Sequence, residues 1–350
     1  MPRELVLTAP RTLTFREYEE PVLKAKQIRV KSILTAEKHG TSLAIYRGKS
    51  PFHVKRYDDR LKLFIPLEEE ERKRAVYPCH VGNMTVGVVV ETGGETSKFK
   101  VGDRVYGYLP ARETHTIDED SPFVWKAPPE LKNEELVCVD PATVALMAVR
   151  EGCVRVGDRV AVFGLGAIGL MTVQMAKIAG AIEVIAVEPI ELRRRLSEKY
   201  GADHVLDPSI CDVASEIKKL TGGLGVDVSI ETSGSYRALH QAIRSTAYGG
   251  NIVPVSWYHG DAVGLDLGEE WHFNRQIMVS GARVESEPYR DHPRWTRSRV
   301  YTTVIELFKR RMLKVEGMLK PIVPFDNAIE AYRLIDEKPE ETVKLAISYA

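Results

Sequence analysis

The chain of 350 residues is long enough for two ordinary domains, and its 44% hydrophobic content can fill two cores. Its 49 lysines and arginines balance 49 aspartates and glutamates, which argues against nucleic acid or an anionic membrane as partner and favours a small molecule. The four cysteines lie far apart and form no C-x-x-C pair that would indicate a structural zinc site or a disulfide framework, so we expect reduced thiols. No run reaches the roughly 18 apolar residues of a membrane helix, and the first residues lack a signal-peptide core, so we expect a cytoplasmic protein.

Residues 1–137 alternate short apolar runs with proline and glycine, as in Leu5–Leu7, Val86–Val90 and Val101–Val105. This spacing is typical of an antiparallel, barrel-like β domain. Residues 49–78 interrupt it with a charged insertion, which we interpret as a solvated surface excursion rather than a binding patch.

From about residue 158 the pattern changes to apolar strands separated by helical segments. Six strands are predicted at Val160–Phe163, Val184–Val187, His204–Leu206, Val226–Ile230, Ile252–Val255 and Ile277–Ser280. Helices are predicted at Ala167–Ala179 and near 191–200, 212–220 and 236–247. Six strands with helical crossovers indicate an α/β domain with a doubly wound parallel sheet.

After about residue 290 the sequence predicts helices at Arg299–Arg310 and Ala328–Ile335 and a closing strand at Val343–Ile347. The six-stranded set is already complete, so this segment is expected to rejoin the first domain. We therefore predict one domain from residues 1–138 and 288–350, and a second from residues 139–287.

A glycine motif, Gly164-Leu165-Gly166-Ala167-Ile168-Gly169, follows the first strand of the second domain and opens a helix. The first glycine permits a tight turn, the second lets a pyrophosphate approach the backbone, and the third permits close packing of helix on strand. The helix N-terminus offers N–H groups and a positive dipole end to the phosphates. This context predicts a dinucleotide site.

Glu188 follows the next strand, where a carboxylate can accept hydrogen bonds from ribose hydroxyls and repel a 2′-phosphate. NAD is therefore favoured over NADP. The run Arg193–Arg195 is the counterargument, because it could bind a phosphate. We assign Glu188 the deciding role and Arg193 a secondary one.

With these motifs, the whole chain resembles the medium-chain dehydrogenase/reductase superfamily. The matching stretches are Val101–Gly107, Val156–Val160, Ala202-Asp203, Glu231–Gly234 and Gly249–Asn251. The resemblance implies a GroES-like β-barrel catalytic domain, split around a Rossmann domain with six parallel strands. It also implies a homodimer or homotetramer.

A narrower resemblance is to the branch of D-guloside and glycoside 3-dehydrogenases. It rests on Lys38–Thr41, Gly82–Met84, Val139–Ala142, His272–Asn274, and Ser286–Pro288 followed by Pro293–Trp295. It implies NAD-dependent oxidation of a secondary hydroxyl on a sugar, glycoside or polyol, or reduction of the 3-keto sugar.

The sequence departs from the zinc-dependent members, which resemble one another in C-G-x-D and G-H-E motifs. His39 stands at the position of the motif's cysteine, and Ser42 stands at the position of its aspartate. Asn83 and Met84 replace the histidine and glutamate of G-H-E. The pair Asp140-Pro141 stands where the zinc members have Glu-Pro. Zinc prefers thiolate, imidazole and carboxylate ligands. His39 and Asp140 could supply two of these, but Asn83 is a poor third, so we expect no metal.

Without zinc, oxidation of an alcohol still needs a proton acceptor. His39 could be the base, with Asp140 orienting its ring. Lys38 could stabilise an alkoxide, or serve as base if desolvation lowered its pKa. Asn83 could hydrogen-bond the reacting oxygen. Two rival functions stay open, namely a zinc-dependent alcohol or polyol dehydrogenase and a non-catalytic nucleotide-binding redox sensor.

Further candidates follow from position in the predicted fold. Thr143 is expected near the nicotinamide or as a helix cap. Thr232, Val255 and Ser256 follow parallel strands, where cofactor contacts concentrate. Residues that could line a sugar pocket are His272, Asn274, Glu287 and Trp295, and Trp295 has a structural role as its alternative.

Overall fold

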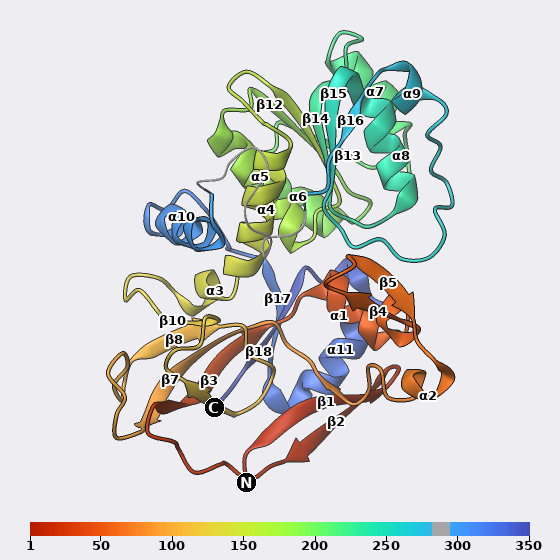
Figure 1. The fold of residues 1–350 in the computed structure, drawn as a ribbon. Coiled ribbons are helices and arrows are strands. Elements are labelled where there is room, and N and C mark those ends of the chain that lie inside the picture. Colours follow the sequence, from red (N-terminus) through yellow and green to blue (C-terminus); the bar gives the residue numbers. More distant parts are fainter. Residues whose placement is uncertain (282–294) are drawn as a thin grey trace. The chain divides into compact units, whose positions relative to one another are not determined.

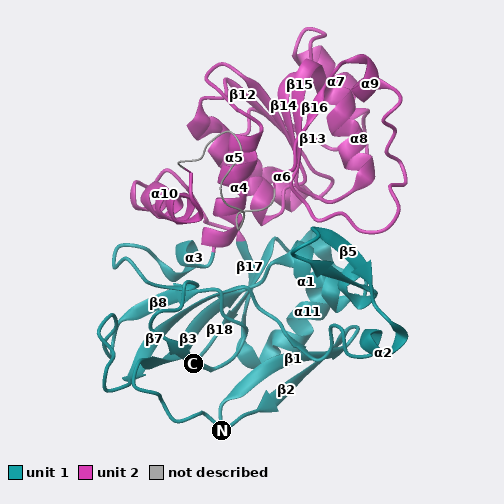
Figure 2. Ribbon diagram, viewed as in Figure 1, with its two compact units in different colours: residues 1–137, 319–350 teal, residues 138–318 magenta. Residues whose placement is uncertain are grey.

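The computed structural model describes residues 1–281 and 295–350 and divides the chain into two compact units (Figure 2). Unit 1 comprises residues 1–137 and 319–350, and unit 2 comprises residues 138–318. The sequence pattern predicts the second boundary at residue 288 instead. Helix α10 (Arg297–Lys309) accounts for the difference, because it packs against α4 (Val139–Glu151) within unit 2.

Unit 1 is built from β-sheets (Figure 1). Its seven-stranded sheet has the order β10-β8-β7-β3-β18-β17, with β9 paired to β3, and a three-stranded sheet has the order β2-β1-β6. The charged insertion forms a β4-β5 hairpin. The strands are β1 (Arg3–Ala9), β2 (Thr12–Glu17), β3 (Gln27–Ala36), β4 (Lys55–Asp58), β5 (Leu63–Pro66), β6 (Cys79–His80), β7 (Met84–Thr92), β8 (Arg104–Gly107), β9 (Thr114–Asp118), β10 (Val124–Lys126), β17 (Leu319–Pro324) and β18 (Lys344–Ser348).

Two helices of unit 1 come from opposite ends of the chain and share one core. Leu43 and Tyr46 of α1 (His39–Tyr46) belong to the same buried cluster as Tyr332 of α11 (Ala328–Glu337) and Leu345 of β18. This shared core fixes the start of α1 against the C-terminal segment. The short helices α2 (Glu69–Arg72) and α3 (Asn133–Leu136) complete the unit.

Unit 2 contains a six-stranded sheet in the order β13-β12-β11-β14-β15-β16, and every pair in it is parallel. This is the predicted doubly wound sheet. Its strands are β11 (Arg159–Phe163), β12 (Glu183–Val187), β13 (His204–Leu206), β14 (Val226–Glu231), β15 (Thr246–Pro254) and β16 (Ile277–Met278). Because the strands are parallel, the turns that follow β11, β12, β14 and β15 gather along one edge.

The helices of unit 2 are α4, α5 (Ala167–Ala179), α6 (Glu191–Lys199), α7 (Val213–Leu220), α8 (Tyr236–Ser245), α9 (Glu270–Phe273) and α10. Helices α5, α6 and α8 pack on the six-stranded sheet, while α4 packs against α5 and α10 packs against α4. Helix α5 has the predicted bounds, whereas α4 was not predicted. Among the described residues, every helix is too short or too polar to span a membrane.

Candidate active site

The glycine motif forms the turn between β11 and α5. Gly164 has φ of +83°, and a Cβ on Gly169 would lie 1.9 Å from the carbonyl oxygen of Gly164. A Cβ on Gly166 would meet nothing within 4 Å. Gly164 is required by its positive φ, and Gly169 is required by the close approach of the Gly164 carbonyl oxygen. Gly166 instead leaves open space beside the N-terminus of α5. This arrangement fits a dinucleotide pyrophosphate.

Glu188 lies directly after β12 and is 3% exposed. Its Oε2 accepts a hydrogen bond from the Leu165 N–H at 2.6 Å, and its Oε1 accepts one from the Ile190 N–H at 3.1 Å. The carboxylate is thus held against the glycine turn, where an adenosine ribose would lie if a dinucleotide bound there.

The three consecutive arginines of α6 have different surroundings. Arg194 donates to the Glu188 carbonyl at 2.8 Å and pairs with Asp207, so its guanidinium is engaged within unit 2. Arg195 is exposed and pairs with Glu191. Burial lowers the pKa of Arg193, and Glu188 opposes this shift. Arg193 is therefore the arginine of this run whose charge lies close to the Glu188 carboxylate.

The turns after β14 and β15 adjoin the glycine turn. Thr232 donates its hydroxyl to the carbonyl of Gly164 at 2.7 Å, and the Val255 N–H donates to the Glu231 carbonyl at 2.8 Å. Ser256, which is half-buried, follows Val255. The sheet therefore brings Thr232, Val255 and Ser256 to the edge that carries the cofactor motif.

One residue at this edge was missed by the sequence analysis. Glu231 is fully buried and accepts hydrogen bonds from the N–H groups of Ser233 at 2.7 Å and Gly234 at 3.1 Å and from the hydroxyl of Tyr258. Burial raises the pKa of Glu231. The Glu231 carboxylate therefore fixes the conformation of the turn after β14. The sequence feature that could have identified this residue is its place in the Glu231–Gly234 motif.

Asp140 and Thr143 lie on α4 in unit 2. Asp140 is buried in the first turn, and Thr143 is fully buried with its hydroxyl donated to the Asp140 carbonyl at 2.8 Å. Thr143 does not cap the helix, because the N-cap residue is Cys138. The predicted cap is therefore wrong, since this threonine bonds the preceding turn of its own helix.

The candidates of unit 1 gather where β3 passes into α1. Lys38 is the N-cap residue of α1 and His39 is its first residue. The Asn83 N–H donates to the carbonyl of Ala36 at 3.1 Å, which holds the Gly82–Asn83 turn beside this junction. The pairing of β3 with β7 thus brings Lys38, His39 and Asn83 into one neighbourhood.

The ring of His39 is held through Nε2, which accepts a hydrogen bond from the Leu345 N–H at 2.8 Å. Because this nitrogen is the acceptor, the neutral ring carries its hydrogen on Nδ1. A histidine base oriented by a carboxylate on Nδ1 would need the Nε2 lone pair for substrate. The geometry therefore favours His39 as a donor through Nδ1 over the predicted role of proton acceptor.

Asn83 presents a second donor. Its Nδ2 atom is buried and has no hydrogen-bond partner within the described parts of the chain. A buried amide nitrogen without a partner is costly, so it suits an oxygen of a bound ligand.

Two predicted pocket residues, His272 and Asn274, lie at the amino ends of the strands in the sheet of unit 2. Asn274 accepts a hydrogen bond from the Gly249 N–H at 2.8 Å, at the amino-terminal half of β15, and His272 is exposed beside it on α9. The cofactor motif lies at the carboxyl ends of the strands. The assignment of His272 and Asn274 to a sugar pocket is therefore corrected, because both residues directly precede β16 and lie at the amino ends of the parallel strands.

Trp295 and Glu287 complete the predicted pocket residues. The guanidinium of Arg150 lies 3.6 Å from the centre of the Trp295 ring, and that of Arg299 lies 4.4 Å from it. These cation–π contacts support the structural alternative for Trp295. Glu287 lies outside the described residues.

The residues at the zinc-ligand positions do not fit a catalytic zinc ion. The Nε2 atom of His39 already accepts the Leu345 N–H, and the hydroxyl of Ser42 is donated to Glu37. Asn83 offers an amide and Met84 a fully buried thioether, neither of which is a preferred zinc ligand.

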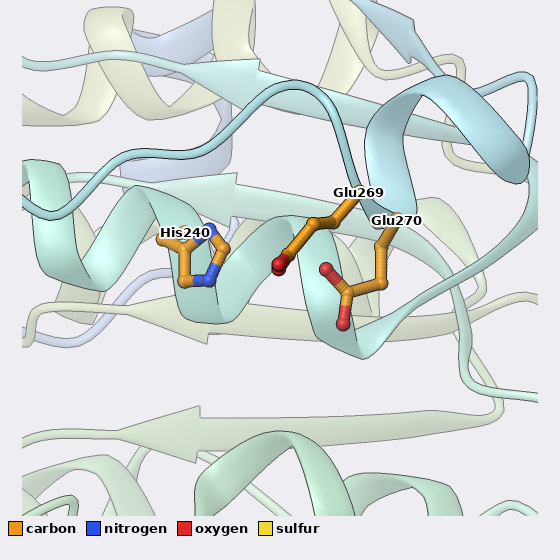
Figure 3. A group of neighbouring side chains, drawn as sticks. All are labelled: His240, Glu269 and Glu270. Atoms are coloured by element: carbon orange, nitrogen blue, oxygen red, sulfur yellow. The ribbon is translucent and has the colours of Figure 1, made fainter.

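One group of potential metal ligands occurs among the described residues, formed by His240, Glu269 and Glu270 (Figure 3). It lies on α8 and at the start of α9, and it contains none of the predicted site residues. His240 Nδ1 accepts the Asp266 N–H at 3.4 Å, so Nε2 of the neutral ring carries the hydrogen and offers no lone pair to a metal.

The side chains at the zinc-ligand positions, His39, Ser42, Asn83 and Met84, do not supply a zinc site, so removal of metal should have little effect on the protein. The alcohol oxidation expected from the sequence should survive purification without added metal and dialysis against EDTA, because no described cluster supplies a zinc ligand set at His39. Emission spectrometry of the same samples measures zinc per chain. About one zinc per chain, lost together with activity on chelation and restored with it, would contradict the expectation.

Comparison with known proteins shows similarity to dehydrogenases. Residues 167–296 match the family model described as "Zinc-binding dehydrogenase". The chain is 39% identical over 350 residues to D-guloside 3-dehydrogenase of Escherichia coli (strain K12), covering 99% of this chain and 100% of the relative. It is 32% identical over 296 residues to (R,R)-butanediol dehydrogenase of Bacillus subtilis (strain 168), covering 77% of this chain and 80% of the relative.

The crystal structure of 2R,3R-butanediol dehydrogenase from Bacillus subtilis is also similar, with a TM-score of 0.77, 26% identity and 99% of each chain covered. Both the end-to-end identity and the shared fold extend over the two units. The chain therefore belongs to the medium-chain dehydrogenase/reductase superfamily, within the zinc-binding dehydrogenase family and on the branch that contains D-guloside 3-dehydrogenase.

Proposed function

We propose that the chain is an NAD-dependent oxidoreductase that interconverts a secondary alcohol of a sugar, glycoside or polyol with its ketone, of the 3-keto-sugar type. The observation that carries this proposal is the 39% identity to D-guloside 3-dehydrogenase along the whole chain. The glycine turn and the strand order of unit 2 support a dinucleotide as the cofactor.

Glu188 supports NAD as that cofactor. Its buried carboxylate is fixed to the Leu165 N–H, so its charge lies where a 2′-phosphate of NADP would be repelled. The bound dinucleotide would accept the hydride at its nicotinamide ring. The protein contributes the position of the cofactor and the proton chemistry.

The junction of β3 and α1 supports that proton chemistry. Oxidation of an alcohol to a ketone needs an acceptor for the hydroxyl proton and donors for the developing negative charge on oxygen. His39 has a hydrogen on Nδ1, and Asn83 has the buried Nδ2 donor described above. We assign these two groups to the reacting oxygen and assign proton acceptance to the neighbouring Lys38 amine. The predicted role of Asp140 as the orienter of the His39 ring is not part of this assignment, because Nε2 accepts the Leu345 N–H and Nδ1 donates to the reacting oxygen.

A substrate screen with a cofactor variant tests the proposal. Glycosides, sugars and polyols are assayed with NAD+ and NADP+ by the absorbance of the reduced nicotinamide. Glu188→Ser should lower kcat/KM for NAD+ by about 10- to 100-fold, because a charged hydrogen-bond acceptor is lost, and should leave the value for NADP+ within a few fold.

Glu191→Ser is the matched control, because Glu191 is an exposed carboxylate three residues after Glu188, at the start of α6. It should behave as the wild type. Equal loss with both cofactors in Glu188→Ser would refute the role of Glu188, and a wild type without turnover of any sugar, glycoside or polyol would refute the proposed substrate class.

A further inference from the structure

A buried carboxylate, Glu37, lies two residues before His39 and is 2% exposed. Its Oε1 accepts the Lys38 N–H at 2.9 Å and the hydroxyl of Ser42. Its Oε2 accepts the Gly82 N–H at 2.8 Å and the hydroxyl of Tyr332. Four donors meet the two oxygens, which is the arrangement that suits an ionised carboxylate.

These donors come from separate parts of the chain. Lys38 and Ser42 belong to the start of α1, Gly82 to the turn before β7, and Tyr332 to α11. Burial raises the pKa of Tyr332 well above its usual range, so its hydroxyl stays protonated and available as a donor. One side chain therefore joins three segments of unit 1.

The main chain of Glu37 adds a fourth segment. Its N–H donates to the Leu345 carbonyl at 2.9 Å, and its carbonyl accepts the Lys344 ammonium at 2.6 Å. The next link is the Leu345 N–H, which donates to Nε2 of His39. The position of the Glu37 backbone and the orientation of the His39 ring thus depend on the same stretch of β18.

We propose that Glu37 is a positioning residue that holds His39 and the Gly82–Asn83 turn in the arrangement needed for catalysis. The Glu37 carboxylate bonds the start of α1 and the Gly82 turn directly, and these two segments carry the replaced zinc-ligand positions His39 and Asn83. The catalytic meaning of this link rests on the function proposed above.

The physical argument for an effect on catalysis is geometric. Donors to the reacting oxygen act fully only when they are held within a few tenths of an ångström of their positions. Glutamine at position 37 has one oxygen and one amide group, so the amide would face either the Lys38 or the Gly82 N–H as a second donor. One of these bonds must open, and either α1 or the Gly82–Asn83 turn is then released.

The experiment compares Glu37→Gln with Glu119→Gln. Glu119 is also a buried carboxylate of unit 1, and its Oε2 accepts the N–H groups of Ser97 and Lys98, both at 2.8 Å. Both variants should lower the thermal midpoint. Only Glu37→Gln should lower kcat, by about 10- to 100-fold, with the Kd for NAD+ unchanged. Tyr332→Phe removes a single donor and should lower kcat by about 3- to 10-fold, which keeps the test open if Glu37→Gln does not fold.

Ring-nitrogen NMR of His39 gives a readout that does not need turnover. The wild type should show the neutral form with hydrogen on Nδ1, and Glu37→Gln, or Tyr332→Phe in its place, should show a mixture of the two tautomers. Equal kcat losses in Glu37→Gln and Glu119→Gln would overturn the proposal. An unchanged His39 tautomer together with an unchanged Asn83 amide resonance would also overturn it, because one of the two segments must be released. If the wild type oxidises no sugar, the proposed function fails, while the NMR result still decides whether Glu37 positions His39.

Discussion

His39→Asn should keep most of the dehydrogenase activity, whereas His39→Gln should lose about 100- to 1,000-fold in kcat. The asparagine amide places a donor near the position of Nδ1, the nitrogen that carries hydrogen because Nε2 accepts the Leu345 N–H. Glutamine instead places an oxygen near Nε2, which preserves the bond to Leu345 and removes the donor. Steady-state rates in both directions, with thermal midpoints as the control for folding, measure the difference.

The pair of variants separates three roles of His39. A donor role predicts an active asparagine variant and an inactive glutamine variant. A base role predicts that both are as inactive as His39→Ala, since neither amide accepts a proton near neutral pH. A purely structural role, limited to the bond with Leu345, predicts that glutamine is tolerated and asparagine is not. Either of the last two results would remove His39 from the proposed donor set.

Gly166→Ala should weaken NAD+ binding by about 10- to 100-fold without loss of stability, whereas Gly169→Ala should destabilise the fold. A Cβ at residue 166 meets nothing within 4 Å, so it would occupy the space left for a pyrophosphate. A Cβ at residue 169 would lie 1.9 Å from the Gly164 carbonyl oxygen and 2.8 Å from the Thr232 hydroxyl. We expect this overlap to cost about 3 kcal/mol or more, because α5 must move away from the turn.

Calorimetric titration with NAD+ and urea unfolding test the two glycines side by side. Each variant is the control for the other, because the same methyl group is added to the same turn. Wild-type affinity in Gly166→Ala would show that no phosphate approaches this glycine. Wild-type stability in Gly169→Ala would show that the turn can relax, contrary to the packing described here.

Much of unit 2 could be predicted from the sequence, because its signals are local. The apolar period of Ala167–Ala179 matched helix α5 residue for residue, and the six predicted strands all occur in the parallel sheet. The glycine spacing placed the turn after β11. Strand ends were less certain, as shown by β15, which begins at Thr246 rather than Ile252.

The sequence pattern was less informative where partners are distant in the chain. His272 and Asn274 are predicted to line a sugar pocket, but they directly precede β16 and lie at the amino ends of the parallel strands. Trp295 had two open roles, and its contacts with Arg150 and Arg299 favour the structural one. Such placements depend on which strands and helices become neighbours, and no local period encodes this.

Residue types and short-range spacing are enough to predict a β-rich domain, a dinucleotide domain and the replacement of the zinc-ligand positions. The hydrogen position on His39 and the burial of Glu37 follow only from the folded chain. His39 and Glu37 both form hydrogen bonds with the main chain of Leu345, which lies 306 residues after His39. The Glu37 carboxylate also accepts hydrogen bonds from Gly82 and Tyr332. A hydrogen bond requires two atoms about 3 Å apart, and only the folded chain brings these atoms together.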